Sequence, residues 1–395
     1  MTSKRPSFAT LAVRAGQKSD PVTGAHATPI FQTSTYQLQS VEYGARLTEA
    51  GPARDAYSRA GNPTVRAVEE KVAALENGEA AVAFGSGIGA IAAVFLSHLR
   101  PGDEVLTLGP IYSDTHTLLT TLLAEYGIAS RRIEPAELDT AIAAATRLIY
   151  VETPGNPTLS IIDLAEVAAT ARRHGILTVA DNTFSSPYVT RPLELGIDIV
   201  VHSATKYLGG QGDLLAGVAV GSVELLTPVR MTGLRLVGAT LDPLAAFLLL
   251  RGMRTLHLRM AAHCANAAAI AEALLGAPGV SKVLYPGLPL HPGHDVAKRQ
   301  MAAFGGMVAL DFSAGRAGAK AFIENLAVFD HAVSLGDVMS LACVSSTTTH
   351  VGLTPAQRAR DGISDGLVRL SVGVEDEADL VADVLQAAEA VPLSA

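Results

Sequence analysis

The sequence predicts an α/β protein in which a largely parallel sheet is covered by helices on both faces. Three observations support this fold class. Short apolar runs of strand length recur between residues 80 and 220, and helical segments too long for hairpin loops lie between them. Polar or glycine-rich motifs directly follow several of the runs. Because ligands bind beyond the carboxyl ends of strands in such sheets, we expect these motifs to form one site.

The first 60 residues are rich in turn formers and lack a long periodic pattern. We expect them to form an irregular arm that makes subunit contacts. Regular structure is predicted to start at Asn62 and Pro63, an N-cap residue followed by proline at the first helical position. Apolar residues then recur at helical spacing, and Asn77 with Gly78 is predicted to end this helix.

Alternating strands and helices follow. The predicted strands are residues 80–84, 104–108, 148–152, 177–181, 197–201 and 218–220. Residues 164–173 are predicted to form a helix between two of these strands. The paired arginines at 131–132 and 172–173 are interpreted as solvated helix or loop positions.

The pattern changes after about residue 250. An alanine-rich helix is predicted at 260–275, strands at 306–311 and 367–372, and a closing helix near Glu375, where acidic residues suit the positive end of a helix. The predicted organisation is therefore an arm (1–60), a cofactor-binding domain (61–250) and a smaller α+β domain (251–395).

Composition excludes several classes of function. The 395 residues carry a formal net charge of −8, which gives no attraction for nucleic acid, and no apolar run approaches the roughly 18 residues of a membrane span. The N-terminus lacks the apolar segment of a secretory signal, so we expect a cytoplasmic protein. The two cysteines form no CxxC pair, and His291 and His294 flank a Pro-Gly pair interpreted as a solvated loop. No metal site is predicted.

The segment Ser203-Ala204-Thr205-Lys206 follows the predicted strand 197–201. Two hydroxyls can donate hydrogen bonds to phosphate oxygens, and a lysine can form a Schiff base with an aldehyde. A strand ending in these groups suits a cofactor that carries both a phosphate and an aldehyde. Pyridoxal 5′-phosphate (PLP) is the common cofactor of this kind.

Two further motifs lie at the same predicted sheet edge. Gly85-Ser86-Gly87-Ile88-Gly89 follows a strand and opens a helix, which is a typical place for backbone amides to hold a phosphate. A dinucleotide site is disfavoured because the spacing is not G-x-G-x-x-G. Asp181 ends the preceding strand, where a carboxylate can face a pyridine nitrogen and keep it protonated.

Several longer segments resemble the cysteine/methionine-metabolism family of PLP-dependent enzymes, which share the aspartate-aminotransferase-like fold (fold type I). The matching segments occur in family order along nearly the whole chain: residues 57–64, 152–158, 181–184, 202–210, 334–336 and 367–373. Within the family, residues 259–266 and 362–366 are most similar to the methionine γ-lyases.

The resemblance implies a role for each matching residue. Lys206 would bind the cofactor and move protons between substrate carbons, Asp181 would pair with the pyridine nitrogen, and Tyr112 would be the general acid, its pKa lowered by Arg59 and the cofactor. The implied cofactor contacts are Gly87, Ile88, Thr183, Ser203, Thr205 and, from a neighbouring subunit, Tyr57 and Arg59. The implied substrate contacts are Arg369, Ser334, Asn156, Asp114 and Met339.

The implied reaction is γ-elimination on a sulfur-containing amino acid, giving a 2-oxo acid, ammonia and a thiol, in a homotetramer with shared active sites. Cystathionine γ-lyase, cystathionine γ-synthase and O-acylhomoserine sulfhydrylase activities, or a lyase for another γ-activated amino acid, are the alternatives. Asp114 stands where methionine γ-lyases carry cysteine, and Met339 where many relatives carry glutamate. Asp114 suits a distal ammonium and Met339 an apolar group, so the distal substituent stays open.

Overall fold

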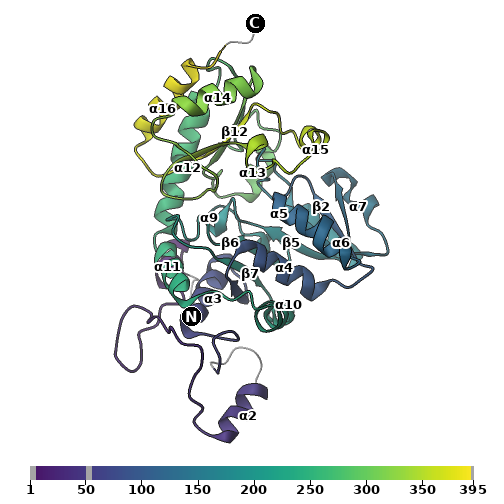
Figure 1. Ribbon diagram of the computed structural model, residues 1–395, viewed down its shortest axis with the longest axis vertical. Helices are drawn as coiled ribbons and strands as arrows, with labels where there is room; N and C mark the ends of the chain where they lie inside the picture. The colour runs from purple at the N-terminus through teal and green to yellow at the C-terminus, as the bar shows by residue number, and fades with distance from the viewer. Residues whose placement is uncertain (1–5, 50–55, 393–395) are drawn as a thin grey trace.

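The computed structural model describes residues 6–49 and 56–392. Within these residues the chain forms a seven-stranded sheet and a five-stranded sheet, each covered by helices (Figure 1). The strands of the large sheet are β1 (Ala80–Phe84), β2 (Glu104–Leu108), β3 (Ala129–Ile133), β4 (Thr146–Glu152), β5 (Leu177–Asp181), β6 (Ile199–Ser203) and β7 (Gly217–Gly221). Those of the small sheet are β8 (Val280–Leu284), β9 (Met307–Phe312), β10 (Asp330–His331), β11 (Leu341–Val344) and β12 (Leu367–Ser371).

The large sheet has the strand order β1-β7-β6-β5-β4-β2-β3. Strands β3, β2, β4, β5 and β6 are parallel to their neighbours, and β7 is antiparallel to both β6 and β1. The parallel order aligns the carboxyl ends of β4, β5 and β6, because each of these strands pairs in register with the next. The prediction of a largely parallel sheet is confirmed.

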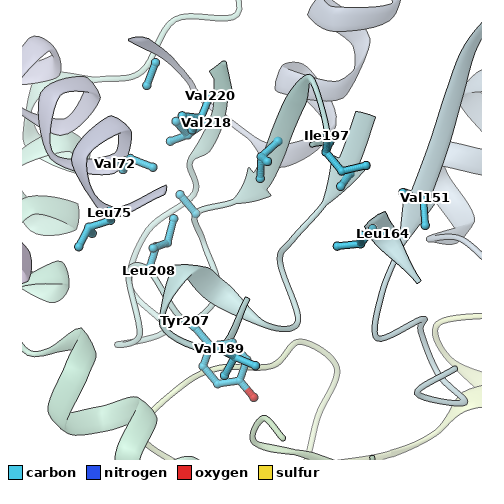
Figure 2. Packing of buried hydrophobic residues seen from close by; sticks show 14 of the residues in the cluster. Val72, Leu75, Val151, Leu164, Val189, Ile197, Tyr207, Leu208, Val218 and Val220 are labelled. Atoms are coloured by element: carbon cyan, nitrogen blue, oxygen red, sulfur yellow. The ribbon is translucent and has the colours of Figure 1, made fainter. Parts of the chain in front are cut away.

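Successive side chains of the central strands point to opposite faces of the sheet and belong to different cores. Leu148 and Tyr150 of β4 pack in one cluster, while Ile149 and Val151 pack in the other. The first cluster includes side chains of α4 (Gly87–His98) and α10 (Val223–Arg230), and the second those of α3 (Pro63–Glu76), α8 (Leu164–His174) and α11 (Pro243–Met253). Figure 2 shows Val72 and Leu75 of α3 and Val218 and Val220 of β7 in the second cluster. Both faces of the sheet are therefore covered, as predicted.

The turn after β6 is anchored in the same core. Tyr207 and Leu208, which directly follow Lys206, are almost completely buried (1% and 2% exposed). Tyr207 and Val189 are both labelled in this cluster in Figure 2. Burial of these two neighbours fixes the backbone from which the Lys206 side chain extends into the site.

The small sheet has the order β10-β11-β12-β9-β8 and is antiparallel except for the β10–β11 pair. It packs with α12 (Leu256–Ala273), α14 (Gly315–Asn325) and α16 (Glu377–Glu389) around a separate core. The long helix α12 runs along the side of the molecule from the level of the large sheet to that of the small one (Figure 1). The domain boundary near residue 250 stays a prediction.

Two short helices lie in the N-terminal arm, which was predicted to be irregular. They are α1 (Phe8–Arg14) and α2 (Val41–Glu49). Helix α1 packs against α3, whereas α2 lies apart from both sheets (Figure 1). The prediction that the arm makes subunit contacts remains a prediction.

Shorter helical segments complete the fold. They are α5 (Ser113–Thr117), η1 (Leu118–Leu122), α6 (Leu123–Glu125), η2 (Pro135–Glu137), α7 (Leu138–Ala141), α9 (Ser186–Val189), η3 (Pro192–Leu195), η4 (Met231–Val237), α13 (His294–Gln300), η5 (Ser345–Thr347) and α15 (Pro355–Arg360). None of the helices in the described residues is long and apolar enough to cross a membrane.

Three local predictions need correction. Arg131 and Arg132 lie on the edge strand β3, whose exposed alternate side chains conceal the strand in the sequence. Strand β6 begins at Ile199 instead of residue 197, because Ile197 is buried within a turn closed by its N–H on the Pro192 carbonyl. His291 is buried (7% exposed) and accepts a hydrogen bond from the Gly293 N–H, so it is not a solvated loop residue.

Candidate active site

One cavity of about 300 Å³ lies at the carboxyl ends of β4, β5 and β6. Most of the predicted site residues line it, although they are spread over 280 positions of the chain from Gly87 to Arg369. They are Gly87, Ile88, Tyr112, Asp114, Asn156, Asp181, Thr183, Ser203, Thr205, Lys206, Ser334 and Arg369. The parallel strand order and the approach of the small sheet through β12 therefore bring these residues together.

The N-terminal end of α4 forms one wall of the cavity. Ser86 caps the helix, and its side chain accepts a hydrogen bond from the Gly89 N–H at 3.1 Å. The first N–H groups of a helix have no partner within the helix, so those of Gly87 and Ile88 can bind an anion. A Cβ at residue 87 would lie 2.7 Å from the Ser203 Cβ. Glycine is thus required for the helix to approach the end of β6.

A tight turn presents the hydroxyls and the lysine to this helix end. The Lys206 N–H donates to the Ser203 carbonyl at 3.2 Å, which closes the turn. The Thr205 hydroxyl accepts a hydrogen bond from the Ala216 N–H at 3.0 Å, and the Ser203 N–H donates to the Thr183 hydroxyl at 2.8 Å. Backbone hydrogen bonds therefore set the positions of Ser203, Thr205 and Thr183 at one end of the cavity.

Two carboxylates meet at the neighbouring strand ends. Asp181, the last residue of β5, lies in register opposite Glu152, the last residue of β4. The buried Tyr150 hydroxyl lies 3.2 Å from the Asp181 Oδ2 and 3.3 Å from the Glu152 Oε1. The Asp181 Oδ1 accepts a hydrogen bond from the Thr183 N–H at 2.9 Å, and the Glu152 Oε1 accepts one from the Tyr112 N–H at 2.8 Å.

Glu152 and Asp181 differ in how readily they ionise. Burial and the charge of Asp181 raise the pKa of Glu152 well above its usual range. Burial also raises the pKa of Asp181, but the two hydrogen bonds that it accepts from Thr183 and the charge of the nearby His202 act in the opposite direction. Two close, buried carboxyls do not both ionise readily. We therefore assign the proton to Glu152, which leaves Asp181 as the carboxylate that can face a cationic ring nitrogen.

Tyr150 and Glu152 were not predicted as site residues. The sequence held one signal for Glu152: it is an acidic residue at the end of an otherwise apolar strand. In the sheet, this strand pairs with the one that ends in Asp181. Phe184 and Thr349 also line the cavity without having been predicted.

The Lys206 side chain reaches the centre of the site. Its Nζ donates a hydrogen bond to the Ser334 Oγ at 2.7 Å. Burial and the Arg369 charge lower the pKa of Lys206 to about 8, so an unprotonated amine is accessible near neutral pH. Ser334 has a φ of 92°, a conformation that costs a non-glycine residue of order 1–3 kcal/mol. The fold thus holds a strained serine against the lysine.

Arg369 on β12 lines the cavity and has one N–H donor without a partner in the described part of the chain. Its Nη1 donates to the Asn156 Oδ1 at 2.9 Å, and its Nη2 to the Ser334 carbonyl at 2.8 Å. Its Nε is buried and has no hydrogen-bond partner among the described residues. A carboxylate could satisfy this donor, since guanidinium and carboxylate groups match in geometry.

Tyr112 lies at another part of the cavity, directly before α5. Its hydroxyl donates a hydrogen bond to the Asp114 Oδ2 at 2.7 Å. Burial and this hydrogen bond raise the pKa of Tyr112 to about 12, opposed only in part by the Arg369 charge. The sequence suggested that Arg59 and the cofactor lower this pKa; the residues of this chain act in the opposite direction. The phenol is therefore held in its protonated form.

Three predicted site residues lie elsewhere. Arg59 packs over the Tyr57 ring at 5.6 Å and donates a hydrogen bond to the Arg235 carbonyl, and neither Arg59 nor Tyr57 lines the cavity. Met339 is half exposed and also does not line it. The structure of one chain thus brings twelve predicted residues together and leaves the roles of these three as predictions.

The donor set fits PLP. A helix N-terminus and two hydroxyls suit a phosphate, Asp181 suits a protonated pyridine nitrogen, and Lys206 suits the aldehyde carbon. The unpaired Arg369 Nε adds a position for an amino-acid carboxylate. Among the described residues, no group of three His, Cys, Asp or Glu side chains is placed to hold a metal ion.

Comparisons with known proteins agree with this geometry. The profile of the family described as "Cys/Met metabolism PLP-dependent enzyme" matches residues 9–389. An L-methionine gamma-lyase of Pseudomonas putida is 46% identical over 98% of this chain and 99% of its own. A cystathionine beta-lyase of Lactococcus lactis is 44% identical over 97% of this chain and 99% of its own. The crystal structure of a cystathionine gamma-lyase from Lactobacillus plantarum, complexed with L-serine, superposes with a TM-score of 0.92 at 38% identity, over 98% of this chain and 99% of the other.

Proposed function

The chain belongs to the Cys/Met metabolism family of PLP-dependent enzymes, and we propose that it catalyses γ-elimination on an α-amino acid whose γ-carbon carries a leaving group. For a sulfur-containing substrate such as methionine, the amino acid and water are converted to a 2-oxo acid, ammonia and a thiol. The observation that carries the proposal is the placement of Lys206, Asp181, Arg369 and Tyr112 around one cavity. The similarity to the L-methionine gamma-lyase of Pseudomonas putida supports the same reaction.

PLP supplies an electron sink that stabilises negative charge at the substrate carbons once its ring nitrogen is protonated. Asp181 would hold the proton on that nitrogen, and Glu152, being neutral, would add no second charge to repel Asp181. Ser203, Thr205, Thr183 and the amides of Gly87 and Ile88 would hold the phosphate. These residues bind and orient; they do not themselves break a bond.

Lys206 would move the protons at the substrate carbons. With a pKa of about 8, its amine can accept a proton from the α-carbon, pass that proton on within the site, and then accept one from the β-carbon. Arg369 would hold the α-carboxylate through its free Nε, while Asn156 and Ser334 keep the guanidinium in place. The strained Ser334 contacts both the lysine and the arginine, so it would fix their relative positions.

Tyr112 would deliver a proton to the departing γ-substituent. A phenol whose pKa is about 12 is protonated throughout the physiological range and is thus in the form that a general acid requires. Loss of the neutral leaving group needs this proton, because a thiolate or another anion departs less readily.

We further propose a homotetramer in which Tyr57 and Arg59 of a neighbouring subunit complete the phosphate site. In support, both residues lie outside the cavity of their own chain, and the arm that carries them extends from the body of the molecule (Figure 1). A cytoplasmic location is part of the same proposal.

The second candidate is γ-elimination or γ-replacement on cystathionine or an acylated homoserine. Within this candidate Asp114 favours cystathionine, because a carboxylate in the cavity suits its distal ammonium better than the methyl of methionine. The similarity to the cystathionine gamma-lyase from Lactobacillus plantarum is consistent with it.

The test is release of 2-oxobutanoate and a volatile thiol from L-methionine by the PLP-loaded enzyme, without an added thiol. The same assay with L-cystathionine and an O-acyl-L-homoserine separates the two candidates. Lys206→Ala, which keeps the fold but loses the amine, is the matched control. Absence of any 2-oxo acid from all three substrates would contradict the proposed function.

A further inference from the structure

Asp114 differs from the other acidic residues that line the cavity. Glu152 is buried and Asp181 is partly buried, and both accept hydrogen bonds, which come from Tyr150, Thr183 and the Tyr112 N–H. Asp114, on α5, is exposed, and its side chain has one hydrogen bond among the described residues, from the Tyr112 hydroxyl at 2.7 Å. Its charge is therefore directed at the cavity without a cationic partner in the described part of the chain.

The two cationic side chains that line the cavity form hydrogen bonds with residues other than Asp114. The Lys206 ammonium is hydrogen-bonded to Ser334, and the Arg369 guanidinium to Asn156 and Ser334. The free Nε of Arg369 points to an amino-acid carboxylate as the bound group. The cavity thus offers a positive group for one end of an amino acid and, on a different element, a negative group.

We infer that Asp114 is a specificity-determining residue that selects substrates whose γ-substituent ends in a cation, an ammonium or a guanidinium, over substrates that end in a methyl thioether. This inference rests on the proposed function. It also assigns the preferred substrate class of the reaction: amino acids that carry a positively charged group beyond the γ-leaving atom.

Two physical effects act in the same direction. An apolar substituent beside Asp114 removes water from the carboxylate and gives it no new partner, which is costly. A cationic substituent replaces that water with a charge-assisted hydrogen bond. Selectivity therefore comes from penalising the neutral end as well as from binding the charged end.

The contact with Tyr112 links this selectivity to catalysis. The Tyr112 proton is shared with Asp114 at 2.7 Å, so it is directed away from a leaving atom while that bond lasts. A cation that pairs with the carboxylate competes for it and frees the hydroxyl. The same positive charge also favours loss of the phenolic proton. Both effects would make Tyr112 a better acid toward a substrate with a cationic end.

The test compares two unreactive amino acids of equal length. L-ornithine has an ammonium where L-norleucine has its terminal methyl, so the pair isolates the distal charge. Binding of each to the PLP-loaded enzyme is measured by titrating the change in cofactor absorbance. We expect the wild type to bind ornithine about tenfold more tightly than norleucine, the effect of one charge-assisted hydrogen bond. Asp114→Asn should abolish this ratio.

Glu125→Gln is the matched control, because it removes an exposed carboxylate at the end of α6 outside the cavity and should leave the ratio unchanged. The ratio for the wild type should also fall with ionic strength, which tests the ion pair without a substitution. Asp114→Ala should behave like Asp114→Asn.

An equal or lower affinity for ornithine in the wild type, or an unchanged ratio in Asp114→Asn, would overturn the inference. If norleucine binds and 2-oxo acid is formed from methionine in that case, the proposed function stands and only the specificity assignment fails. If neither amino acid alters the cofactor absorbance and no 2-oxo acid forms, the proposed function fails with it.

Discussion

The two ends of the cavity are built in different ways. At the end that suits the cofactor, Asp181 and Ser203 end adjacent parallel strands, and their positions follow from strand register. Toward Asp114, the wall is α5, a five-residue helix that follows a loop. The sheet edge tolerates little change in position, whereas a short helix on a loop can vary in sequence without disturbing the core. In the proposed function, the sheet thus holds the residues for the cofactor chemistry, and the loop holds the residue for substrate choice.

Removal of the amine at the sheet end should have the largest effect. Lys206→Ala removes the amine that we propose binds the cofactor covalently and moves protons, so we expect turnover to fall by about 10³-fold or more. The absorbance of the Schiff base between the cofactor and the lysine should also be lost. Retention of both absorbance and turnover would show that another lysine serves the reaction.

Loss of the Tyr112 hydroxyl should affect proton donation to the substrate without affecting cofactor binding. Tyr112→Phe removes the proton donor while leaving Lys206 and its contacts intact, so kcat should fall by about 10²–10⁴-fold with the cofactor absorbance unchanged. Steady-state kinetics and an absorbance spectrum measure both. A variant with normal kcat would remove Tyr112 from the role of acid.

Replacing Arg369 with a lysine should weaken substrate binding more than it slows the chemical step. Arg369→Lys cannot reproduce the planar fork that also contacts Asn156 and Ser334, so KM should rise by about 10- to 100-fold. A larger change in kcat than in KM would indicate that Arg369 chiefly holds Ser334 and Lys206 in place.

The pH dependence of cofactor uptake should show the smallest effect. Only the neutral amine of Lys206 attacks an aldehyde, and its pKa is lowered to about 8 by burial and Arg369. The rate at which cofactor-free protein takes up PLP should therefore rise with pH and reach half its maximum near pH 8. Removing the positive charge in Arg369→Gln should move this midpoint to higher pH. A midpoint that stays in place would mean that Arg369 does not affect the lysine.

The sheet end could be predicted from the sequence because its signals are local. Strands β1, β2 and β5 match the predicted ranges, and the helix after Gly85-Ser86 begins where glycine and an N-cap residue require it. Side chains that end consecutive parallel strands meet at one edge, so the order of strands alone brings Asp181 near Ser203 and Lys206.

The remaining features depend on contacts that local patterns do not encode. Strand β3 was missed because it is an edge strand with exposed, charged side chains. The Tyr112–Asp114 hydrogen bond depends on a helical turn within a loop, and Ser334, which has a positive φ, meets Lys206 and Arg369 only through long-range contacts. Met339 was assigned to the site by its place in the sequence, yet it does not line the cavity of this chain.

The most direct test of the account is to locate the bound cofactor. Reduction of the PLP-loaded enzyme with borohydride fixes the cofactor to its lysine, and peptide mass spectrometry then identifies the residue. Lys71 is the informative comparison, because burial also lowers its pKa to about 8, yet its Nζ is bound to the Ala12 carbonyl at 2.6 Å outside the cavity. We expect the label on Lys206 alone; a label on Lys71 or another lysine, with Lys206 unmodified, would contradict the role proposed for Lys206.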